Sequence, residues 1–325
     1  MTISTSSEHS SERGPWHPGE RQMQARLGVA ERMAVIGPRM VHDAMPAQHL
    51  AFYAQLPALV VGAVDEAGAP WATMLEGAPG FMHSPDPRTL RVAALPDRDD
   101  PVDAALAAGS ALGCLGIELP TRRRNRVNGR VQARDDQGFT LAVEQAFGNC
   151  PQYIQTRTPG LAPDGPAATV ERGTSLDDAA RATIRAADTC FVASYVDLDG
   201  DPDRRAVDVS HRGGRPGFVR VDGDLLTIPE FSGNLQFNTL GNLLLNPRAG
   251  LVFIDFERGD LLQLSGVTEL GFPGEEFAGE ELAAFAGAER LWRLEVQHWV
   301  RRRGALGLRW RFGDYAPTSL ATGRW

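Results

Sequence analysis

Apolar residues recur along the chain in short runs that Gly, Pro and Asp close, a pattern typical of β-strands. Residues 191–200, FVASYVDLDG, form an apolar run that ends in Asp-Gly. Residues 205–210, RAVDVS, alternate before the turn sequence RGGRPG, and a later run, GLVFIDF, covers residues 250–256. Many short strands separated by turn residues predict a mainly β protein built from β-barrels.

The same series of strands occurs twice. Residues 60–70, VVGAVDEAGAP, align with 192–202, VASYVDLDGDP, and GCLGIEL (113–119) aligns with GLVFIDF (250–256). One insertion near 210–214 accounts for the change of offset between these two matches. The pattern predicts one unit present twice, at about 52–157 and 186–300. Chance similarity among glycine-punctuated strands is the alternative.

Four segments follow from this reading. Residues 1–19 are Ser-rich and acidic without an apolar core, which predicts a disordered N-terminus and no signal peptide. Residues 20–157 are expected to hold a helical extension, broken at Gly37-Pro38, and a degenerate first barrel. Residues 158–185 begin with TPGLAPDGPAAT and predict a linker and a short helix. Residues 186–325 are expected to form the second barrel and a C-terminal extension.

Composition narrows the function classes. The net charge of −8 argues against a nucleic-acid partner, because such partners need a basic surface. Every one of the 33 basic residues is Arg, so no lysine can form a Schiff base. Three widely spaced cysteines fit a reducing compartment, and no run approaches the length of a membrane helix. We therefore expect a cytoplasmic protein with no membrane partner and no metal site.

One stretch of the second unit is polar but carries no charge. From Phe231 to Pro247 the chain has hydroxyl and amide side chains where a strand precedes a helix near 235–245, which Asn246-Pro247 ends. Helix N-termini bind anions through free N–H groups and the helix dipole. The stretch therefore predicts a pocket for a polar ligand, and a helix cap without ligand is the alternative. The candidate residues are Ser232, Asn234, Gln236, Asn238 and Thr239.

The order of these features resembles a known family. An arginine-bearing strand (204–209), the polar loop, the helix closed by Asn246-Pro247-Arg248 and the strand 250–256 are similar to the pyridoxamine 5′-phosphate oxidase-like family of FMN-binding split β-barrels. The resemblance covers the second unit well and the first faintly. Residues 147–154, FGNCPQYI, resemble a segment of larger tandem members. It implies two tandem split barrels that form a pseudo-dimer within one chain, with flavin at their interface.

The resemblance also implies flavin-binding residues. The phosphate-binding arginine of the family falls on Arg205, with Arg204 next to it, and a guanidinium can hold a phosphate with two hydrogen bonds. Val207, Asp208 and Val209 would offer backbone groups to the ring edge, followed by Ser210. The family's substrate-phosphate lysine also falls on Ser210, and its basic pair before the helix is absent. Both departures put pyridoxamine phosphate in doubt as the substrate.

The first unit is expected to supply one wall of a single complete site. It has Ala72-Thr73 where the second unit has the two arginines, so it is expected to keep the fold without its own phosphate site. The candidates that reach across the interface are Arg122, Arg123, Arg124, Cys150 and Tyr153. Solvated arginines at a strand end are the alternative. Asn149 is expected to cap a helix beginning near Cys150, which would lower the thiol pKa; a structural cysteine is the alternative.

Three functions remain open from the sequence. The leading one is an FMN-dependent oxidoreductase that acts on a small molecule, with NAD(P)H or a reductase as electron donor. A flavin carrier without turnover is the second. Haem binding or degradation on the same fold is the third, with His211 as the candidate iron ligand. The chain is expected to act as a monomer or a homodimer, and no catalytic residue can be named.

Overall fold

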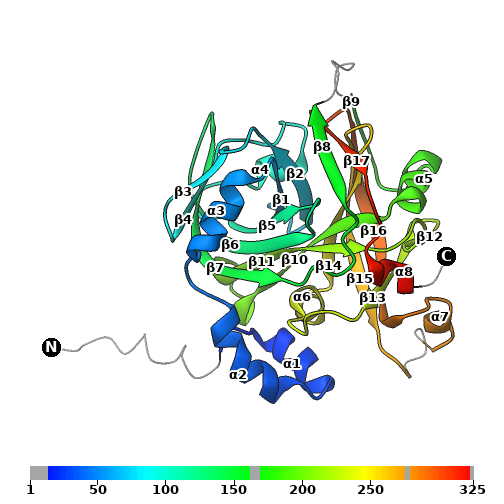
Figure 1. The fold of residues 1–325 in the computed structure, drawn as a ribbon. Helices are drawn as coiled ribbons and strands as arrows, with labels where there is room; N and C mark the ends of the chain where they lie inside the picture. Colours follow the sequence, from blue (N-terminus) through cyan, green and yellow to red (C-terminus); the bar gives the residue numbers. More distant parts are fainter. Residues whose placement is uncertain (1–13, 162–168, 275–278, 323–325) are drawn as a thin grey trace.

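Two antiparallel sheets make up most of the computed structural model, which describes residues 14–161, 169–274 and 279–322 (Figure 1). The first sheet contains β1 (Ala58–Val64), β2 (Pro70–Glu76), β3 (Met82–Asp86), β4 (Thr89–Val92), β5 (Ala111–Glu118), β6 (Arg123–Asp135) and β7 (Gly138–Asn149). The second contains β10 (Thr189–Asp197), β11 (Arg205–Gly213), β12 (Arg220–Asp222), β13 (Leu225–Phe231), β14 (Arg248–Asp255), β15 (Asp260–Gly271) and β16 (Ala288–Arg303), and β9 (Thr169–Gly173) pairs with β16.

Both sheets have the same order of strands. The first runs β2-β1-β5-β6-β7-β4-β3, and the second runs β11-β10-β14-β15-β16-β13-β12. Each strand of the first sheet thus has an equivalent in the second, in the same sequence order. The predicted fold class is confirmed: mainly β, with two tandem split barrels that form a pseudo-dimer within the chain. The internal repeat in the sequence and the domain boundaries stay predictions.

Three large hydrophobic clusters and a small fourth one hold the barrels together in the described part of the chain. The first barrel encloses Leu59, Val61 and Phe139, and the second encloses Val192, Phe253 and Trp292. A third cluster lies between the barrels and contains Val60, Phe191 and Val209, among others. Successive strand residues point to opposite faces, so Leu59 and Val61 face one cluster and Val60 the other. Burial on both faces explains why β1 and β10 are almost continuously apolar.

Two equivalent glycines let the barrels approach each other. A Cβ at Gly113 of β5 would lie 2.8 Å from Asp208 Cα of β11, and one at Gly250 of β14 would lie 2.1 Å from the Pro70 carbonyl oxygen of β2. These distances are below van der Waals contact, so each position excludes a side chain. The contacts of β5 with β11 and of β14 with β2 are equivalent under the shared strand order. The barrel contact is therefore close to two-fold symmetric.

Short helices cover the ends of the sheets. They are α1 (Pro18–Arg26), α2 (Ala30–Met40), α3 (Ala47–Gln55), α4 (Pro101–Ala104), α5 (Asp178–Ala186), α6 (Asn238–Leu245), α7 (Gly279–Ala283) and α8 (Pro317–Ala321), with 3-10 turns η1 (Leu198–Gly200) and η2 (Pro202–Arg204). A small sheet pairs β8 (Arg157–Leu161) with β17 (Leu308–Phe312). None of the described helices combines the length and apolar character that a membrane span requires.

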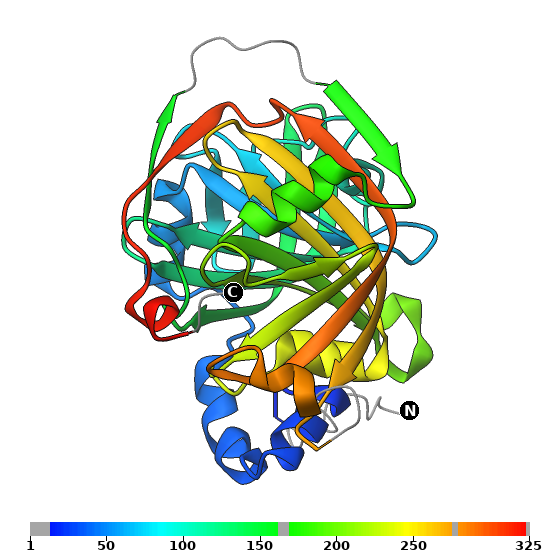
Figure 2. The ribbon, with the colours of Figure 1, turned by 90° about the vertical axis from the view of Figure 1, so that its right-hand side faces the viewer.

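The N-terminal helices differ from expectation in one respect. Helix α2 continues through Gly37-Pro38 and ends two residues later at Met40, since Pro38 removes its own hydrogen bond to the carbonyl four residues back and the helix extends little beyond it. Gly37 instead admits the Trp16 indole, which is buried against it. Helix α1 packs on α6 beneath the barrels (Figure 2). Of the predicted disordered N-terminus, 1–13 lie outside the described residues, while Pro18 already begins α1. Of the predicted linker, residues 162–168 also lie outside the description.

Candidate functional site

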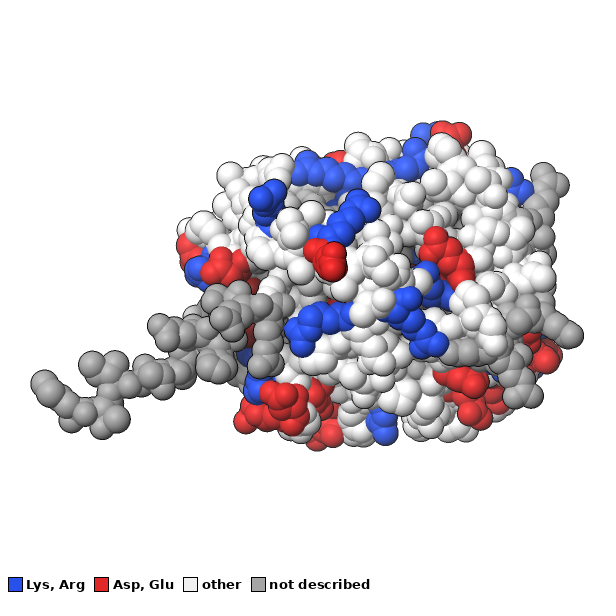
Figure 3. Space-filling view, turned by 90° about the horizontal axis from the view of Figure 1, so that it is seen from below, with Lys and Arg blue, Asp and Glu red and all other residues white. Residues whose placement is uncertain are grey.

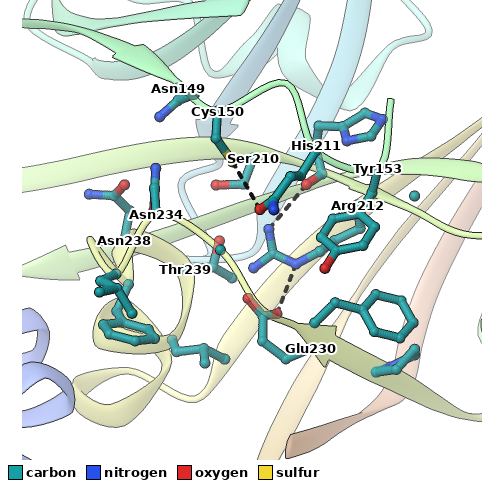
Figure 4. A pocket seen from close by; sticks show the side chains of 18 of the residues that line it. Asn149, Cys150, Tyr153, Ser210, His211, Arg212, Glu230, Asn234, Asn238 and Thr239 are labelled. Atoms are coloured by element: carbon teal, nitrogen blue, oxygen red, sulfur yellow. Dashed lines mark hydrogen bonds and ion pairs between the residues drawn. The ribbon is translucent and has the colours of Figure 1, made fainter. Parts of the chain in front are cut away.

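A polar pocket lies where the two barrels meet (Figure 4). The second half contributes the end of β11, the loop 233–237 and the start of α6. The first half contributes the start of β6 and the segment Asn149–Tyr153 that follows β7. The free space within it is about 100 Å³, smaller than the roughly 300–1,000 Å³ of most ligand pockets. Side chains at the mouth therefore occupy part of the space that a ligand would need.

Strand β11 divides its residues between the pocket and the barrel interface. Val209 belongs to the apolar cluster between the barrels, and His211, which also lines the pocket, stacks edge-on against Phe191 of that cluster. Asp208, Ser210 and Arg212 have the opposite parity and form polar contacts. This alternation follows from the two-residue period of a strand. The register of β11 thus brings Ser210 and Arg212 to the pocket.

Arginines outnumber carboxylates around the pocket. Its lining includes the four arginines Arg124, Arg126, Arg212 and Arg290 and the two glutamates Glu230 and Glu289. Three of the arginines have a carboxylate partner: Arg126 pairs with Asp208 at 3.1 Å, Arg212 with Glu230 at 2.9 Å and Arg290 with Glu289 at 2.8 Å. In the view from below, arginines spread across the middle of the surface and most carboxylates lie toward its margins (Figure 3). The pocket favours an anion although the whole chain is acidic.

Arg124 is the arginine of this pocket that has no acidic partner. Its Nε donates to the Cys150 carbonyl oxygen at 2.7 Å, and an Nη lies 3.6 Å from Cys150 Sγ. No described carboxylate lies within 4.0 Å of its guanidinium. Burial, together with the nearby Arg126 and Arg212, lowers the pKa of Arg124 to about 10, so the side chain is still a cation at neutral pH. A partly buried charge without a counterion is costly, and an anionic ligand would remove that cost.

The backbone before α6 has an unusual conformation. Leu235 and Phe237 both have φ near +63°, in the left-handed region that non-glycine residues rarely adopt. Tyr153, on the opposite wall, has φ +64°. Phe237 occupies the N-cap position of α6, and no side chain caps the helix, so its first N–H groups lack the usual partner. Strained backbone of this kind is concentrated at ligand sites, and an open helix N-terminus suits an anion.

Several buried polar atoms around the pocket lack hydrogen-bond partners. They include Thr239 Oγ1, Asn149 Oδ1, Arg126 Nε and both ring nitrogens of His211. An unpaired buried polar group costs about 1–3 kcal/mol, so proteins seldom keep several together. A ligand rich in oxygen and nitrogen atoms could satisfy them. The donors, the charge and the open helix end therefore fit a phosphate-bearing cofactor, while the free volume requires side chains at the mouth to move.

A buried polar network supports the pocket from below. Asp208 accepts hydrogen bonds from Arg126, from Asn128 Nδ2 at 2.8 Å and from Asn242 Nδ2 at 3.0 Å. The network continues to α1, where Glu20 accepts from Asn238 Nδ2 at 2.5 Å. Burial, and then the charge of Asp208, raise the pKa of Glu20 to about 8. The first half, the second half and α1 are thus joined under one pocket.

The two arginines expected to hold the phosphate do not line this pocket. Arg205 lies at the other end of β11, where it binds Asp197 through two hydrogen bonds of 2.7 and 2.9 Å and stacks over Tyr195. Arg204 is exposed and pairs with Asp199. Each guanidinium already has a carboxylate partner. Of the flavin-binding residues predicted on β11, Ser210 alone lines the pocket; Asp208 is buried and pairs with Arg126 of the pocket, Val207 is buried against Tyr195 toward the other end of the strand, and Val209 faces the other barrel.

The predicted loop and cross-interface residues divide in the same way. Asn234, Asn238, Thr239, Arg124, Cys150 and Tyr153 line the pocket. Ser232 is exposed and offers its carbonyl oxygen to the Tyr153 hydroxyl at 3.0 Å, and Gln236 is buried behind the loop. Arg122 holds the Ile154 carbonyl oxygen at 2.9 Å, and Arg123 points to α3 and covers Phe52.

One local expectation was wrong. No helix begins at Cys150: β7 ends at Asn149 and a turn follows, so Asn149 does not cap a helix there. His211, the candidate iron ligand, is buried in β11 and lines the pocket, and burial, followed by the charges of Arg124 and Arg212, keeps its pKa well below the usual value. Sequence reasoning missed Arg126, Arg212, Glu230 and Arg290. The alternation of β11 could have found Arg212, which shares a face with Ser210.

Comparison with known proteins gives partial matches to solved structures. HupZ of Group A Streptococcus is 16% identical, with a TM-score of 0.28, over 37% of this chain and 89% of that chain. A Lactobacillus delbrueckii protein provisionally described as a pyridoxamine 5′-phosphate oxidase is 18% identical, with a TM-score of 0.26, over 33% and 95%. The FAD binding protein of Mycobacterium smegmatis is 14% identical, with a TM-score of 0.28, over 40% and 99%. No family model and no curated protein matches the chain.

Proposed function

We propose that the pocket between the barrels binds a flavin, FMN in the first instance, and that the chain is an oxidoreductase acting on a small molecule. The observation that carries this proposal is Arg124, a cation without a carboxylate partner, beside an uncapped helix that begins at Asn238. Arg124, Arg212 and Thr239 would hold the phosphate. Charge-assisted hydrogen bonds of this kind are the strong ones in proteins.

The flavin would supply electron and hydride transfer, and the chain would orient it and control its surroundings. Ser210 and Asn149, from opposite halves, offer polar groups along the pocket wall. Tyr153 lies over Phe231, with ring centroids 5.1 Å apart, and covers the mouth. Burial raises the pKa of Tyr153 to about 12, so its phenol keeps its proton at neutral pH. The electron donor would be NAD(P)H or a reductase.

Entry of a flavin requires room that the present side-chain arrangement does not offer. Tyr153 is only partly buried, and its hydroxyl has a single hydrogen bond, to the Ser232 carbonyl oxygen. Swinging its ring off Phe231 is the smallest change that widens the mouth. The Arg212–Glu230 pair is the second barrier, since its exchange for an Arg212–phosphate pair would free Glu230 toward solvent.

The test compares ligands that differ by one group. FMN should bind at least ten-fold more tightly than riboflavin, which lacks the phosphate, because a charge-assisted contact contributes about 1.5–3 kcal/mol. Flavin fluorescence quenching measures both, with FAD as a third ligand. Equal affinities for FMN and riboflavin would contradict the phosphate assignment.

Turnover is tested separately on the flavin-loaded protein. Bleaching of the flavin absorbance by NADH or NADPH, and its return with an acceptor, would support the oxidoreductase over a carrier. A stable flavin complex that neither nucleotide nor a reductase reduces would favour the carrier. A Soret band in place of flavin bands would indicate haem binding and contradict the proposal.

A further inference from the structure

A second cleft occupies the equivalent position on the other side of the barrel contact. Its walls are the end of β2 with residues 77–79, the loop 95–100 before α4, and residues 305–308 between β16 and β17. Strand β2 is the equivalent of β11, and β16 the equivalent of β7, in the shared order of strands. The cavity has a volume of about 600 Å³, within the range of small-molecule sites. The two clefts are thus equivalent by position in the fold, and the second is the roomier one.

The charge of the second cleft is opposite to that of the first. It is lined by the three carboxylates Glu76, Asp97 and Asp100 and by one arginine, Arg302. The first cleft has four arginines and two glutamates. The apolar share of the second cleft comes from prolines and leucines of both halves, including Pro57, Pro79, Leu95, Leu306 and Leu308. An anion suits the first cleft, and the second is unfavourable for one.

Arg302 is not available to a ligand. Its Nε donates to Gln263 Oε1 at 3.1 Å, one Nη donates to Asp97 at 3.1 Å, and the other donates to Thr73 Oγ1 at 3.2 Å and to Asp100. Asp100 is buried and also accepts from Gln263 Nε2 at 2.9 Å. The carboxylates of Asp97 and Asp100 thus already neutralise the charge of Arg302. Arg302, the one arginine among the described lining residues, therefore offers no free charge to a phosphate, and Arg309 beside the cleft donates to the Leu306 and Leu308 carbonyl oxygens.

The Glu76 carboxylate has one oxygen without a hydrogen-bond partner. Its Oε2 receives the Gly307 N–H at 2.7 Å and the Leu308 N–H at 3.0 Å, so the carboxylate bridges the two halves at the cleft wall. Its Oε1 is buried and has no hydrogen-bond partner. Burial raises the pKa of Glu76, while the Leu308 and Gly307 N–H groups, then the charge of Arg309 and the nearby Trp310 indole, act to lower it. A donor placed in the cleft would satisfy this oxygen.

We propose that this second cleft is a binding site for a small organic cation, an amine on an apolar body, with Glu76 as the acceptor of the ammonium group. The apolar walls would cover the body of the ligand, and Asp97 at the rim would add attraction for its charge. The site is separate from the flavin pocket and does not depend on it. The duplicated architecture would then hold an anionic cofactor at one cleft and a cationic ligand at the other.

The test uses three probes of one shape on the full chain: benzylamine, benzyl alcohol and benzoate. In ¹H–¹⁵N NMR titrations at neutral pH, benzylamine should saturate and shift the amides of residues 74–78 and 305–308. Benzyl alcohol should bind at least ten-fold more weakly, and benzoate should cause no shifts there. E76Q keeps an acceptor for the Gly307 and Leu308 N–H groups but removes the charge, and it should lower benzylamine affinity at least ten-fold.

Two further variants make the test decisive. E144Q, an exposed carboxylate of β7 away from the cleft, should bind benzylamine as the unmodified chain does. A78W places an indole at the exposed edge of the cleft and should block benzylamine even if E76Q proves unstable. Equal binding of benzoate and benzylamine, unchanged affinity in both E76Q and A78W, or no saturable binding would overturn the proposal.

Discussion

Arg124 lies against the Cys150 carbonyl oxygen with no carboxylate in reach, and Thr239 buries a hydroxyl oxygen without a partner. An apolar side chain of similar shape at either position would stabilise a fold that binds no ligand, because it would remove an unpaired charge or an unpaired hydroxyl. Their surroundings come from opposite halves of the chain, since Arg124 is in β6 and Thr239 in α6. At the scale of single residues, the pocket is built for a ligand rather than for the stability of the fold alone.

Arg124→Ala should weaken FMN binding by about 1.5–3 kcal/mol, which corresponds to roughly ten- to 150-fold in Kd. The adjacent Arg123 points away to α3, so Arg123→Ala should leave the Kd within about two-fold. Arg205→Ala decides between the two ends of β11. A larger loss of affinity in Arg205→Ala than in Arg124→Ala, measured by flavin titration, would place the phosphate at the start of β11 instead.

Thr239→Val should separate ligand binding from stability. Valine has nearly the same shape and removes the unpaired hydroxyl, so the ligand-free protein should be as stable as before or more stable by about 1 kcal/mol. FMN affinity should fall about three- to ten-fold, because a neutral hydrogen bond contributes about 0.5–1.5 kcal/mol. Thr268→Val is the matched control, since Thr268 Oγ1 is also buried without a partner but lies outside the pocket. A fall in FMN affinity in both variants would contradict the assignment of Thr239 to the phosphate.

At the scale of elements, α1 holds the start of α6 in place. Gly19 and Gly241 lie where the two helices cross: a Cβ at Gly19 would lie 2.0 Å from the Gly241 carbonyl oxygen. Gln24 Nε2 reaches the Gln236 carbonyl oxygen at 3.5 Å, and Glu20 binds Asn238. These contacts hold the loop with the left-handed residues Leu235 and Phe237. The N-terminal extension is thus part of the pocket's support.

Gly241→Ala tests this contact, because its expected effect on stability is opposite to that of the same change in an exposed helix. Inside an exposed helix the change would stabilise by up to about 1 kcal/mol. Here the new Cβ would lie 2.7 Å from the Glu20 backbone nitrogen, so we expect a loss of about 1–3 kcal/mol and earlier proteolysis within α1. Gly160→Ala, whose Cβ would lie 4.0 Å from the Arg309 carbonyl oxygen, is the control in thermal unfolding. A stabilised Gly241→Ala would show that α1 does not pack on α6 as described.

Glu20 gives the protein a specific dependence on pH. Burial holds its pKa in the folded chain at about 8, above the usual value of 4.5. Below pH 4.5 both states are protonated, and between 4.5 and 8 the unfolded state loses its proton first. The free energy of unfolding should therefore fall as pH rises through this window and level off above it, by an amount on the order of a few kcal/mol.

The control for this prediction is Glu20→Gln, which cannot ionise and can still accept from Asn238. Its stability should change less between pH 5 and pH 8, and at pH 8 it should exceed that of the unmodified chain. Thermal unfolding at several pH values measures both. A Glu20→Gln variant whose pH dependence matches the unmodified chain would show that Glu20 does not titrate in this range.

Sequence reasoning reached the architecture because the strands are regular. Apolar runs closed by Gly and Asp placed β10, β11 and β14, and their recurrence predicted a second, equivalent set. It also found the loop before α6, since a stretch of amides and hydroxyls without charge is uncommon beside a helix. The sequence did not show which arginines line the pocket. Arg205 and Arg212 lie on one strand, and only tertiary register decides which end of that strand meets the other barrel.

Other misses have the same cause. Cys150 follows an asparagine and precedes a proline, which is a local signal for a helix start, but the chain must turn there to bring Tyr153 to the pocket. Pro38 signals a break, yet it falls in the last turn of α2. Glu230 and Arg290 come from β13 and β16 and meet only through strand pairing. Local signals fix elements, and contacts between elements fix the site.

At the scale of the whole molecule, the equivalent strand orders of the two barrels produce two equivalent clefts with different chemistry. In the first, Arg124 has no protein anion, and in the second, Asp97 and Asp100 neutralise Arg302. A homodimer of identical barrels would have two equivalent clefts. A chain with two unequal halves can keep one cleft for an anionic cofactor while the chemistry of the other cleft changes. The asymmetry lies in the arginines that line the two clefts: Arg124 donates to a backbone carbonyl oxygen, whereas Arg302 pairs with two carboxylates.

The number of flavins per chain tests this asymmetry most directly. After saturation with FMN and removal of the excess, flavin released on denaturation should be about one mole per mole of full chain. The second half alone, residues 170–325, lacks Arg124, Asn149 and Tyr153 and should retain little of it. Two flavins per chain, or an isolated second half that holds FMN as tightly as the full chain, would contradict a single site built by both halves.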